Sequence, residues 1–237
     1  MKFHSPLLSG VILRRYKRFL CDIVLDNNNE HVVAHCPNSG SMKGIPLFNS
    51  HVMVSYNPLP SRKYQYTLEM VHNGNTWIGI NTMYPNSLVE EGIINGTIAE
   101  LNPYSSIKRE VVCSDKSRLD LMVEQRDSIC YVEVKNVTLA EGSRALFPDS
   151  VTLRGQKHLL ELIRLKRSGY RAIMIYVVQR SDCIDMGPAW NIDSEYAEKL
   201  VAAVKEGVEA YVYQAEVSPE EITLIRRIPI EIHRTII

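Results

Sequence analysis

The run AIMIYVV at positions 172–178 places the tightest constraint on how this chain can fold. Consecutive apolar residues rich in β-branched side chains predict a strand that is covered on both faces. The preceding segment, RGQKHLLELIRLKRSG, predicts an amphipathic helix that ends at Gly169. Its expected buried side is Leu159, Leu160, Leu162, Ile163 and Leu165, and its expected polar stripe is Lys157, His158, Glu161 and Arg164. A strand, this helix and the buried strand would form a right-handed crossover on a partly parallel sheet.

The segments around this unit complete an α/β pattern. NSLVEEGIING predicts a short helix with Asn86 or Ser87 as its cap and Gly96 near its end. KREVVCS, SRLDLMVE and SICYVEVKN predict three consecutive strands. DSEYAEKLVAAVKEGVE predicts a second amphipathic helix, and AYVYQAEV and ITLIRRIPI predict two closing strands.

Residues 8–82 differ from the rest of the chain because they read as all-β. VVAHC, HVMVSY, YQYTLEMVH and TWIGIN are short strand candidates separated by turn signals, and the NGN turn predicts a hairpin. About five short strands in this space are typical of a small OB-like barrel. A chain of 237 residues is long enough for two cores. We therefore expect an α/β (α+β) protein with an OB-like β-barrel at 1–82 and a mixed-sheet domain at 83–237.

Charge and cysteine content limit the functional classes. The net charge is zero, but residues 1–82 carry eight Lys and Arg against four Asp and Glu. That asymmetry fits a polyanion partner for the first domain, and it fits chance variation of solvated charge equally well. The five cysteines form no CxxC pair, which predicts reduced thiols in a cytoplasmic protein. The longest apolar run is too short to cross a bilayer, so we expect no membrane contact.

The predicted hairpin can bring two acidic side chains and a lysine together on one face of the sheet. Asp120 in SRLDLMV should share a face with Arg118 and Met122, opposite a face formed by Leu119, Leu121 and Val123. Glu133 and Lys135 in YVEVK should share a face on the next strand. Neighbouring carboxylates repel unless a cation lies between them, and oxygen donors suit Mg²⁺ or Mn²⁺.

The spacing of Asp120, Glu133 and Lys135 is that of the PD-(D/E)xK nucleases. In such a site Lys135 would help to activate a water molecule for phosphodiester hydrolysis. Glu90, Glu91 and Glu110 are further acids that could add ligands. The alternative is a solvent-facing ion pair between Glu133 and Lys135, which would contribute at most about 1 kcal/mol.

A long segment, TLAEGSRALFPDSVTLRGQKHL, separates the YVEVK strand from the helix, and we expect it to be a functional loop. Five of its polar residues should gather near the carboxyl end of that strand, where open α/β sheets bind ligands. They are Thr138, Asp149, Arg154, Gln156 and His158. The structural alternatives are a turn cap for Asp149, a surface ion pair for Arg154 and simple exposure for His158.

The first domain contains a basic and aromatic stretch. Arg14, Arg15, Tyr16, Lys17 and Arg18, followed by Phe19, are expected along one strand, where they could contact phosphates and unpaired bases. A charged edge strand with an aromatic residue in the core explains the stretch equally well. The segment HCPNSGSMKG predicts a tight turn in which Lys43 and exposed amides could hold a phosphate or the domain junction.

Several long segments, taken in order, resemble the sugar fermentation stimulation protein A (SfsA) family of bacteria. They are RYKRFLCDI, HCPNSGSMKG, SRLDLMVE, YVEVKNVTL and FPDSVTLRGQKHLLEL. The resemblance implies an OB-like domain followed by a PD-(D/E)xK nuclease-like mixed-sheet domain. It implies Asp120 and Glu133 as metal ligands with the Val134 carbonyl as a third, and Lys135 as the residue that activates water.

The resemblance also bears on partners and function. It implies that Asp149, Arg154, Gln156 and His158 line the metal pocket, and it favours DNA as the partner of the basic stretch. Family members are described as non-specific DNA-binding proteins with a role in maltose or other sugar metabolism. We therefore expect a DNA-binding protein with a Mg²⁺- or Mn²⁺-dependent nuclease site. The alternatives are a catalytically silent DNA-binding regulator and a hydrolase of small molecules, and the sequence leaves the oligomeric state open.

Overall fold

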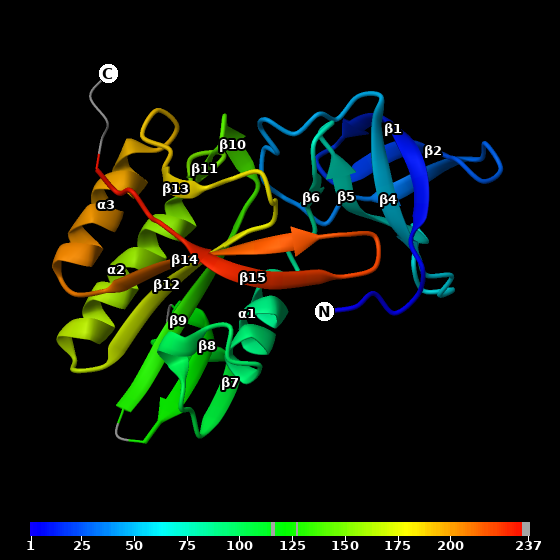
Figure 1. Ribbon diagram of the computed structural model, residues 1–237. Coiled ribbons are helices and arrows are strands. Elements are labelled where there is room, and N and C mark those ends of the chain that lie inside the picture. The colour runs from blue at the N-terminus through cyan, green and yellow to red at the C-terminus, as the bar shows by residue number, and fades with distance from the viewer. Residues whose placement is uncertain (115–116, 127, 234–237) are drawn as a thin grey trace.

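The computed structural model describes residues 1–114, 117–126 and 128–233, and it consists of two domains that lie side by side (Figure 1). The first is a barrel of five strands: β1 (Leu8–Tyr16), β2 (Leu20–Leu25), β3 (His31–His35), β4 (Ser50–Tyr56) and β5 (Tyr66–His72). A parallel pairing of β3 with β5 closes it. The hairpin predicted at NGN is confirmed, because β6 (Trp77–Gly79) pairs antiparallel with β5. The predicted OB-like barrel is therefore correct.

The second domain is built on a six-stranded mixed sheet in the order β15-β14-β12-β9-β8-β7. Its strands are β7 (Ser106–Ser114), β8 (Ser117–Gln125), β9 (Ser128–Val137), β12 (Arg171–Val178), β14 (Glu209–Val217) and β15 (Ile222–Ile228). The predicted β8–β9 hairpin forms, although residue 127 of its turn lies outside the described residues. Helix α1 (Pro85–Ile94) packs against one face, and α2 (Leu153–Arg167) and α3 (Ser194–Lys205) pack against the other. A short 3-10 turn (Ala99–Leu101) follows α1.

The central crossover agrees with the sequence pattern. Strands β9 and β12 are parallel neighbours with α2 between them in the chain, and β12 is buried along its apolar run. Two details of α2 differ from the prediction: Leu160 is 51% exposed, whereas His158 is buried. The burial of His158 arises because the N-terminal half of α2 borders a polar cavity, so hydrophobicity alone does not define its inner side.

The segment between β9 and α2 is not the irregular loop that the sequence suggested. It contains a hairpin of β10 (Leu139–Glu141) and β11 (Arg144–Phe147), with Gly142 at positive φ in the turn. Strand β11 also pairs in parallel with β13 (Asp185–Pro188), which was not predicted either. These strands have only three or four residues, so alternation of side chains cannot identify them.

The predicted cap of α1 is wrong. The helix begins at Pro85, a residue whose fixed φ suits the first turn, and its preceding residue, Tyr84, makes no side-chain capping bond. Asn86 instead points to the sheet, as described below. Gly96 does follow the helix end, in the left-handed conformation that favours glycine.

The two domains contact each other through backbone as well as side chains. The amide of Gly79 donates to the Gln179 carbonyl at 2.9 Å, and a Cβ at position 79 would lie only 2.5 Å from the Gln179 side-chain oxygen. The first residues of the chain lie against the second domain, where the backbones of Lys2 and Glu221 form an isolated antiparallel β-bridge. The boundary at residue 82 stays a prediction.

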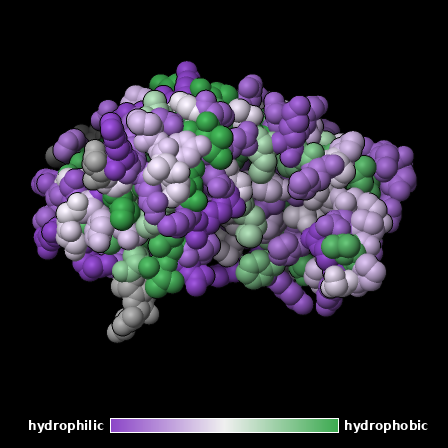
Figure 2. Space-filling view, turned by 90° about the horizontal axis from the view of Figure 1, so that it is seen from below, coloured by the Kyte–Doolittle hydropathy of each residue, from purple (hydrophilic) through white to green (hydrophobic). Residues whose placement is uncertain are grey.

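The surface and the helices add two further observations. Hydrophilic residues predominate on the face seen in Figure 2, and hydrophobic ones form small separate groups. Across residues 1–114, 117–126 and 128–233, no helix is long and apolar enough to span a bilayer.

Candidate functional site

The regular pairing of β7 with β8 is interrupted at the level of Asp120. The pairing joins Arg109 to Leu121 and Val111 to Leu119 but omits Glu110 and Asp120 between them, and Glu110 has φ +52°. Leu119 packs in the core beneath α2 and α3, whereas Leu121 packs in the core beneath α1. The predicted common face of Leu119, Leu121 and Val123 is therefore wrong, because the alternation of side chains reverses at Asp120.

This interruption places the Asp120 carboxylate beside β9. Its Oδ2 accepts a hydrogen bond from the Val134 backbone N–H at 2.8 Å, and its Oδ1 accepts one from the Asn86 side chain at 2.9 Å. Burial, and then the negative charge of Glu133, raise the pKa of Asp120 above its usual value. An ionised Asp120 is thus held in a place where a further positive charge would stabilise it.

The backbone of Val134 faces the same gap. In a strand, the N–H and C=O of one residue point to the same neighbouring strand. Because the Val134 N–H points to Asp120, its carbonyl oxygen is directed to the side on which Asp120 lies. This direction is compatible with the ligand role that the family resemblance implies for Val134.

Glu133 is the most buried acid of the group, with 2% of its side chain exposed. Its Oε1 accepts hydrogen bonds from Lys135 Nζ and His158 Nδ1, whereas its Oε2 is buried and makes no hydrogen bond within the described residues. Burial acts to raise the pKa of Glu133, but the charges and hydrogen bonds of Lys135 and His158 outweigh it and hold the pKa below its usual value. Since Lys135 is only 15% exposed, the solvent-facing ion pair considered from the sequence is excluded.

Basic side chains from the start of α2 complete this cluster. His158 Nδ1 lies 3.3 Å from Lys135 Nζ, and Arg154 Nε lies 3.4 Å from His158 Nε2. Residues four apart on a helix share a face, so Arg154 and His158 point in the same direction. Thr152 fixes the start of the helix by accepting a hydrogen bond from the Gly155 N–H at 3.1 Å.

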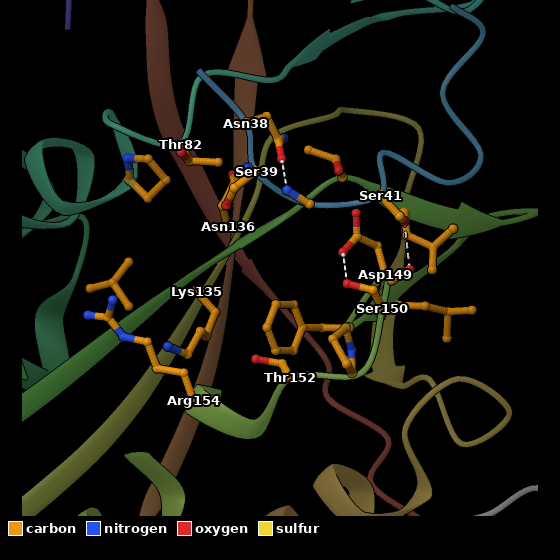
Figure 3. Close-up of a pocket in the computed structure, with 18 of the residues that line it drawn as sticks. Asn38, Ser39, Ser41, Thr82, Lys135, Asn136, Asp149, Ser150, Thr152 and Arg154 are labelled. Atoms are coloured by element: carbon orange, nitrogen blue, oxygen red, sulfur yellow. Dashed lines mark hydrogen bonds between the residues drawn. The ribbon is translucent and has the colours of Figure 1, made fainter. Parts of the chain in front are cut away.

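These residues line a cavity of about 1030 Å³ between the two domains (Figure 3). The predicted residues brought together in the cavity are Asp120, Glu133, Val134, Lys135, Thr138, Asp149, Arg154 and His158. The first domain contributes Arg15, Arg18 and residues 38–41 to the opposite wall.

Gln156 is the predicted pocket residue that the structure places elsewhere. Its buried side chain donates to both carboxylate oxygens of Asp193, at 3.0 and 3.3 Å, and it does not line the cavity. Asp193 is the N-cap of α3, where it accepts a hydrogen bond from the Tyr196 N–H. Gln156 therefore joins two helices, because its position on α2 faces α3 rather than the cavity.

Asp149 connects the domains. Its Oδ2 accepts a hydrogen bond from the Met42 N–H at 2.8 Å, and its backbone carbonyl accepts one from Ser41 Oγ at 2.7 Å. We call residues 38–42 the junction loop. The sequence left two roles open for the HCPNSGSMKG turn, a phosphate site and a part of the domain junction. The structure places the turn at the domain junction.

Arg15 supports the junction loop from the other side. Its guanidinium donates to four backbone carbonyls, those of Arg18, Asn38, Gly40 and Ser41, at 2.8 to 3.3 Å. With its donors used in this way, Arg15 organises the loop. The expectation that this side chain contacts phosphate is therefore not favoured by its environment.

The remaining basic residues of the first domain are dispersed. The chain turns at residues 17–19, with Lys17 and Arg18 at positive φ, so the expected single strand from Arg14 to Phe19 is wrong. Arg14 pairs with Asp22 at 2.6 Å and lies over the Tyr16 ring. Arg18 lines the cavity. Contacts of Arg14, Tyr16, Lys17, Arg18 and Lys43 with DNA stay a prediction.

Other acids considered from the sequence are committed to ion pairs outside the cavity. Glu90 pairs with Arg109, Glu91 with the amino terminus, and Glu110 with Arg118. Within the described parts of the chain, no three His, Cys, Asp or Glu side chains gather as a metal cluster. A cation here would rely on two carboxylates, a backbone carbonyl and water, which is a donor set that Mg²⁺ accepts.

Sequence reasoning missed Asn86 and the junction loop as parts of this site. Asn86 was considered only as a helix cap, and its position one residue after the start of α1 gave no other signal. The loop's Gly and Ser content did indicate a tight turn. Its distance in the sequence from the carboxylates concealed that it lies opposite them.

Comparisons with known proteins agree with this architecture. The family model described as "SfsA N-terminal OB domain" matches residues 13–80, and that described as "Sugar fermentation stimulation protein RE domain" matches residues 83–221. Sugar fermentation stimulation protein homologs from Pelobacter propionicus and Geotalea daltonii are each 52% identical to the chain. These matches cover 95% and 97% of this chain and 97% and 99% of the relatives.

A solved structure is similar over the same length. SfsA from Pyrococcus furiosus, in complex with Ca²⁺, is 27% identical, with a TM-score of 0.88 and coverage of 98% of both chains. The resemblance inferred from the motifs is thus confirmed by full-length relatives and by the fold. The chain belongs to the sugar fermentation stimulation protein family.

Proposed function

We propose that this protein hydrolyses phosphodiester bonds of nucleic acid with the help of a divalent cation. The observation that carries the proposal is the Glu133 side chain, which is buried beside Asp120 and whose Oε2 makes no hydrogen bond to any residue that the structure describes. A buried charged oxygen without a partner is costly, and a cation would stabilise it. The Ca²⁺ in the Pyrococcus furiosus relative supports a divalent cation in this family fold.

The ligands available are oxygen atoms from three residues. Glu133 offers Oε2, Asp120 offers its half-buried carboxylate, and Val134 offers its backbone carbonyl. When bound, Mg²⁺ or Mn²⁺ would supply Lewis-acid polarisation of a phosphate oxygen and would lower the pKa of a water molecule. Oxygen donors without thiolates favour these hard cations.

Lys135 and the basic residues of α2 supply the remaining chemistry. Lys135 Nζ lies against Glu133 at the cavity wall, where its ammonium group can hold a water molecule by donating a hydrogen bond and can stabilise the negative charge that develops as this water loses its proton. Arg154 is exposed and lines the cavity, so its guanidinium can bind a phosphate oxygen. His158 fixes Lys135 and Glu133 relative to each other.

A catalytically silent DNA-binding regulator, linked to maltose or other sugar metabolism, is the second candidate. One observation favours it: Lys135 already forms an ion pair with Glu133, and His158 donates a hydrogen bond to the same carboxylate, as they would in a purely structural cluster. In that case the carboxylates would hold the sheet to α2, and nucleic acid would bind without cleavage.

Cleavage assays separate the two candidates. Labelled single-stranded and duplex DNA and RNA would be incubated with protein and Mg²⁺ or Mn²⁺, using wild type, Glu133→Gln, Lys135→Ala and the exposed-residue control Lys157→Ala. We expect Glu133→Gln and Lys135→Ala to lose about a hundredfold to a thousandfold in rate, with Lys157→Ala unchanged. Equal cleavage by all four proteins, or none with nucleic acid still bound, would refute the catalytic role and favour the regulator.

A further inference from the structure

A second cavity, of about 760 Å³, adjoins the first. It lies between the barrel, the N-terminal segment and the start of α1, and Ser39 and Thr82 line both cavities. Its volume falls within the range of roughly 300–1,000 Å³ of pockets that hold small organic groups. The two cavities therefore form neighbouring compartments of one interdomain surface.

Aromatic side chains from four segments line this second cavity. They are Phe3 near the amino terminus, Phe19 in the β1–β2 turn, Tyr56 at the end of β4 and Tyr84 before α1. Phe19 is 45% exposed and Tyr56 is also exposed, although burial of such rings is normally favourable. Exposed rings that face a cavity, rather than a core, are available to stack on a flat ligand.

The cavity also has polar groups that are already held in place. Glu69 is buried, and its carboxylate accepts hydrogen bonds from Ser55 Oγ at 2.6 Å and from the Asn81 side chain at 2.8 Å. Arg62 donates to Thr67 at 2.8 Å and adds positive charge at the same wall. Aromatic rings combined with a carboxylate, an amide and a guanidinium match the flat faces and polar edges of a nucleobase.

We propose that the second cavity binds an unpaired base of a nucleic acid strand whose backbone continues into the first cavity. This inference rests on the proposed function for its substrate class and extends it to the form of the substrate. A base can enter a cavity of this kind only when it is not stacked within a duplex. The protein therefore prefers single-stranded or unpaired segments, and Phe19 and Tyr56 provide stacking surfaces.

The test measures binding without catalysis. Fluorescence anisotropy with labelled single-stranded and duplex oligonucleotides of one sequence, in EDTA, would compare wild type with Phe19→Ala, Tyr56→Ala and Phe48→Ala. Phe48 is the matched control because it is 72% exposed on the same domain and lines neither cavity. Thermal melts would verify that each variant is folded.

We expect wild type to bind the single strand at least tenfold more tightly than the duplex. Loss of one stacking ring in Phe19→Ala or Tyr56→Ala should weaken single-strand binding about tenfold, and Phe48→Ala should bind as wild type does. Equal affinity for both forms, or equal binding by Phe19→Ala, Tyr56→Ala and Phe48→Ala, would overturn the inference. Because this assay contains no free cation, it measures binding and not cleavage. Absence of cleavage in the separate Mg²⁺ or Mn²⁺ assay, with single strands still preferred in EDTA, would refute the proposed function alone. Cleavage with cations but no preference for single strands in EDTA would refute this inference alone.

Discussion

Replacement of Asp120 by Asn isolates the electrostatic basis of the candidate metal site. In wild type, burial and the neighbouring Glu133 charge disfavour the ionised Asp120. Asparagine at this position keeps an oxygen that can accept the hydrogen bond from the Val134 N–H. The Asn86 amide can turn so that its oxygen accepts a hydrogen bond from the new side-chain NH2 group. We therefore expect Asp120→Asn to be at least as stable as wild type without cations, although most substitutions of partly buried residues destabilise.

A divalent cation, in contrast, should stabilise wild type more than it stabilises Asp120→Asn. A ligand at 100 times its Kd stabilises the folded state by about 2.7 kcal/mol. For a chain of 237 residues, this corresponds to a rise in Tm of about 5–10 °C, at roughly 2–4 °C per kcal/mol. Wild type should show this rise with Mg²⁺, Mn²⁺ or Ca²⁺, and Asp120→Asn should lose most of it.

Differential scanning calorimetry with a cation titration measures both effects. Asp149→Asn is the matched control because it removes a carboxylate from the same cavity, at the position that binds the junction loop. It should keep the cation-induced rise in Tm even if its starting Tm is lower. The reasoning would be refuted if Asp120→Asn responded to cations as wild type does, or if Asp149→Asn alone lost the response.

Three further outcomes follow from individual contacts. Asp149→Ala should lower the free energy of unfolding by about 1.5–3 kcal/mol in urea titrations, because a charged acceptor between the domains is lost; a change below 0.5 kcal/mol would contradict its role at the junction. Gln156→Ala should lower the free energy of unfolding by about 1–3 kcal/mol, because it removes a buried donor to Asp193, and it should leave cleavage per folded molecule unchanged. A loss of cleavage per folded molecule would show instead that Gln156 belongs to the functional site. The pKa of Glu133 is lowered by folding, so its ionised form stabilises the folded state above pH 4.5, and this stabilisation is lost as the pH falls further. The pKa of Asp120 is raised by folding, so its ionisation destabilises the folded state as the pH rises above 3.8. Acid titrations followed by circular dichroism should therefore show a weaker loss of stability at low pH in Glu133→Gln than in wild type, and the opposite order would contradict these pKa directions.

Much of the fold was predictable because its signals are local. The buried strand at 172–178 and the amphipathic helix before it determine the crossover, and Gly169 lies at the expected end of that helix. The alternation in β9 correctly placed Glu133 and Lys135 on one face. These features depend on periodicity and on turn chemistry, which a single sequence displays.

The features that were missed depend on tertiary context. Nothing local marks Glu110 for a positive φ, so the reversal of side-chain faces at Asp120 could not be foreseen. His158 was expected on a polar stripe, but it is buried because Glu133 supplies a partner from another element. Likewise Gln156 faces Asp193, which lies 37 positions later in the chain. Polar residues in a helix pattern do not reveal which of their neighbours will be polar.

The most direct test of the metal-dependent site is a crystal structure of the protein grown with Mn²⁺, with anomalous diffraction recorded at the manganese edge. We predict an anomalous peak within about 2.0–2.4 Å of carboxylate oxygens of Asp120 and Glu133 and of the Val134 carbonyl oxygen. The same crystals of Glu133→Gln should lack that peak. An occupied Mn²⁺ site elsewhere, with no peak between Asp120 and Glu133, would contradict the account.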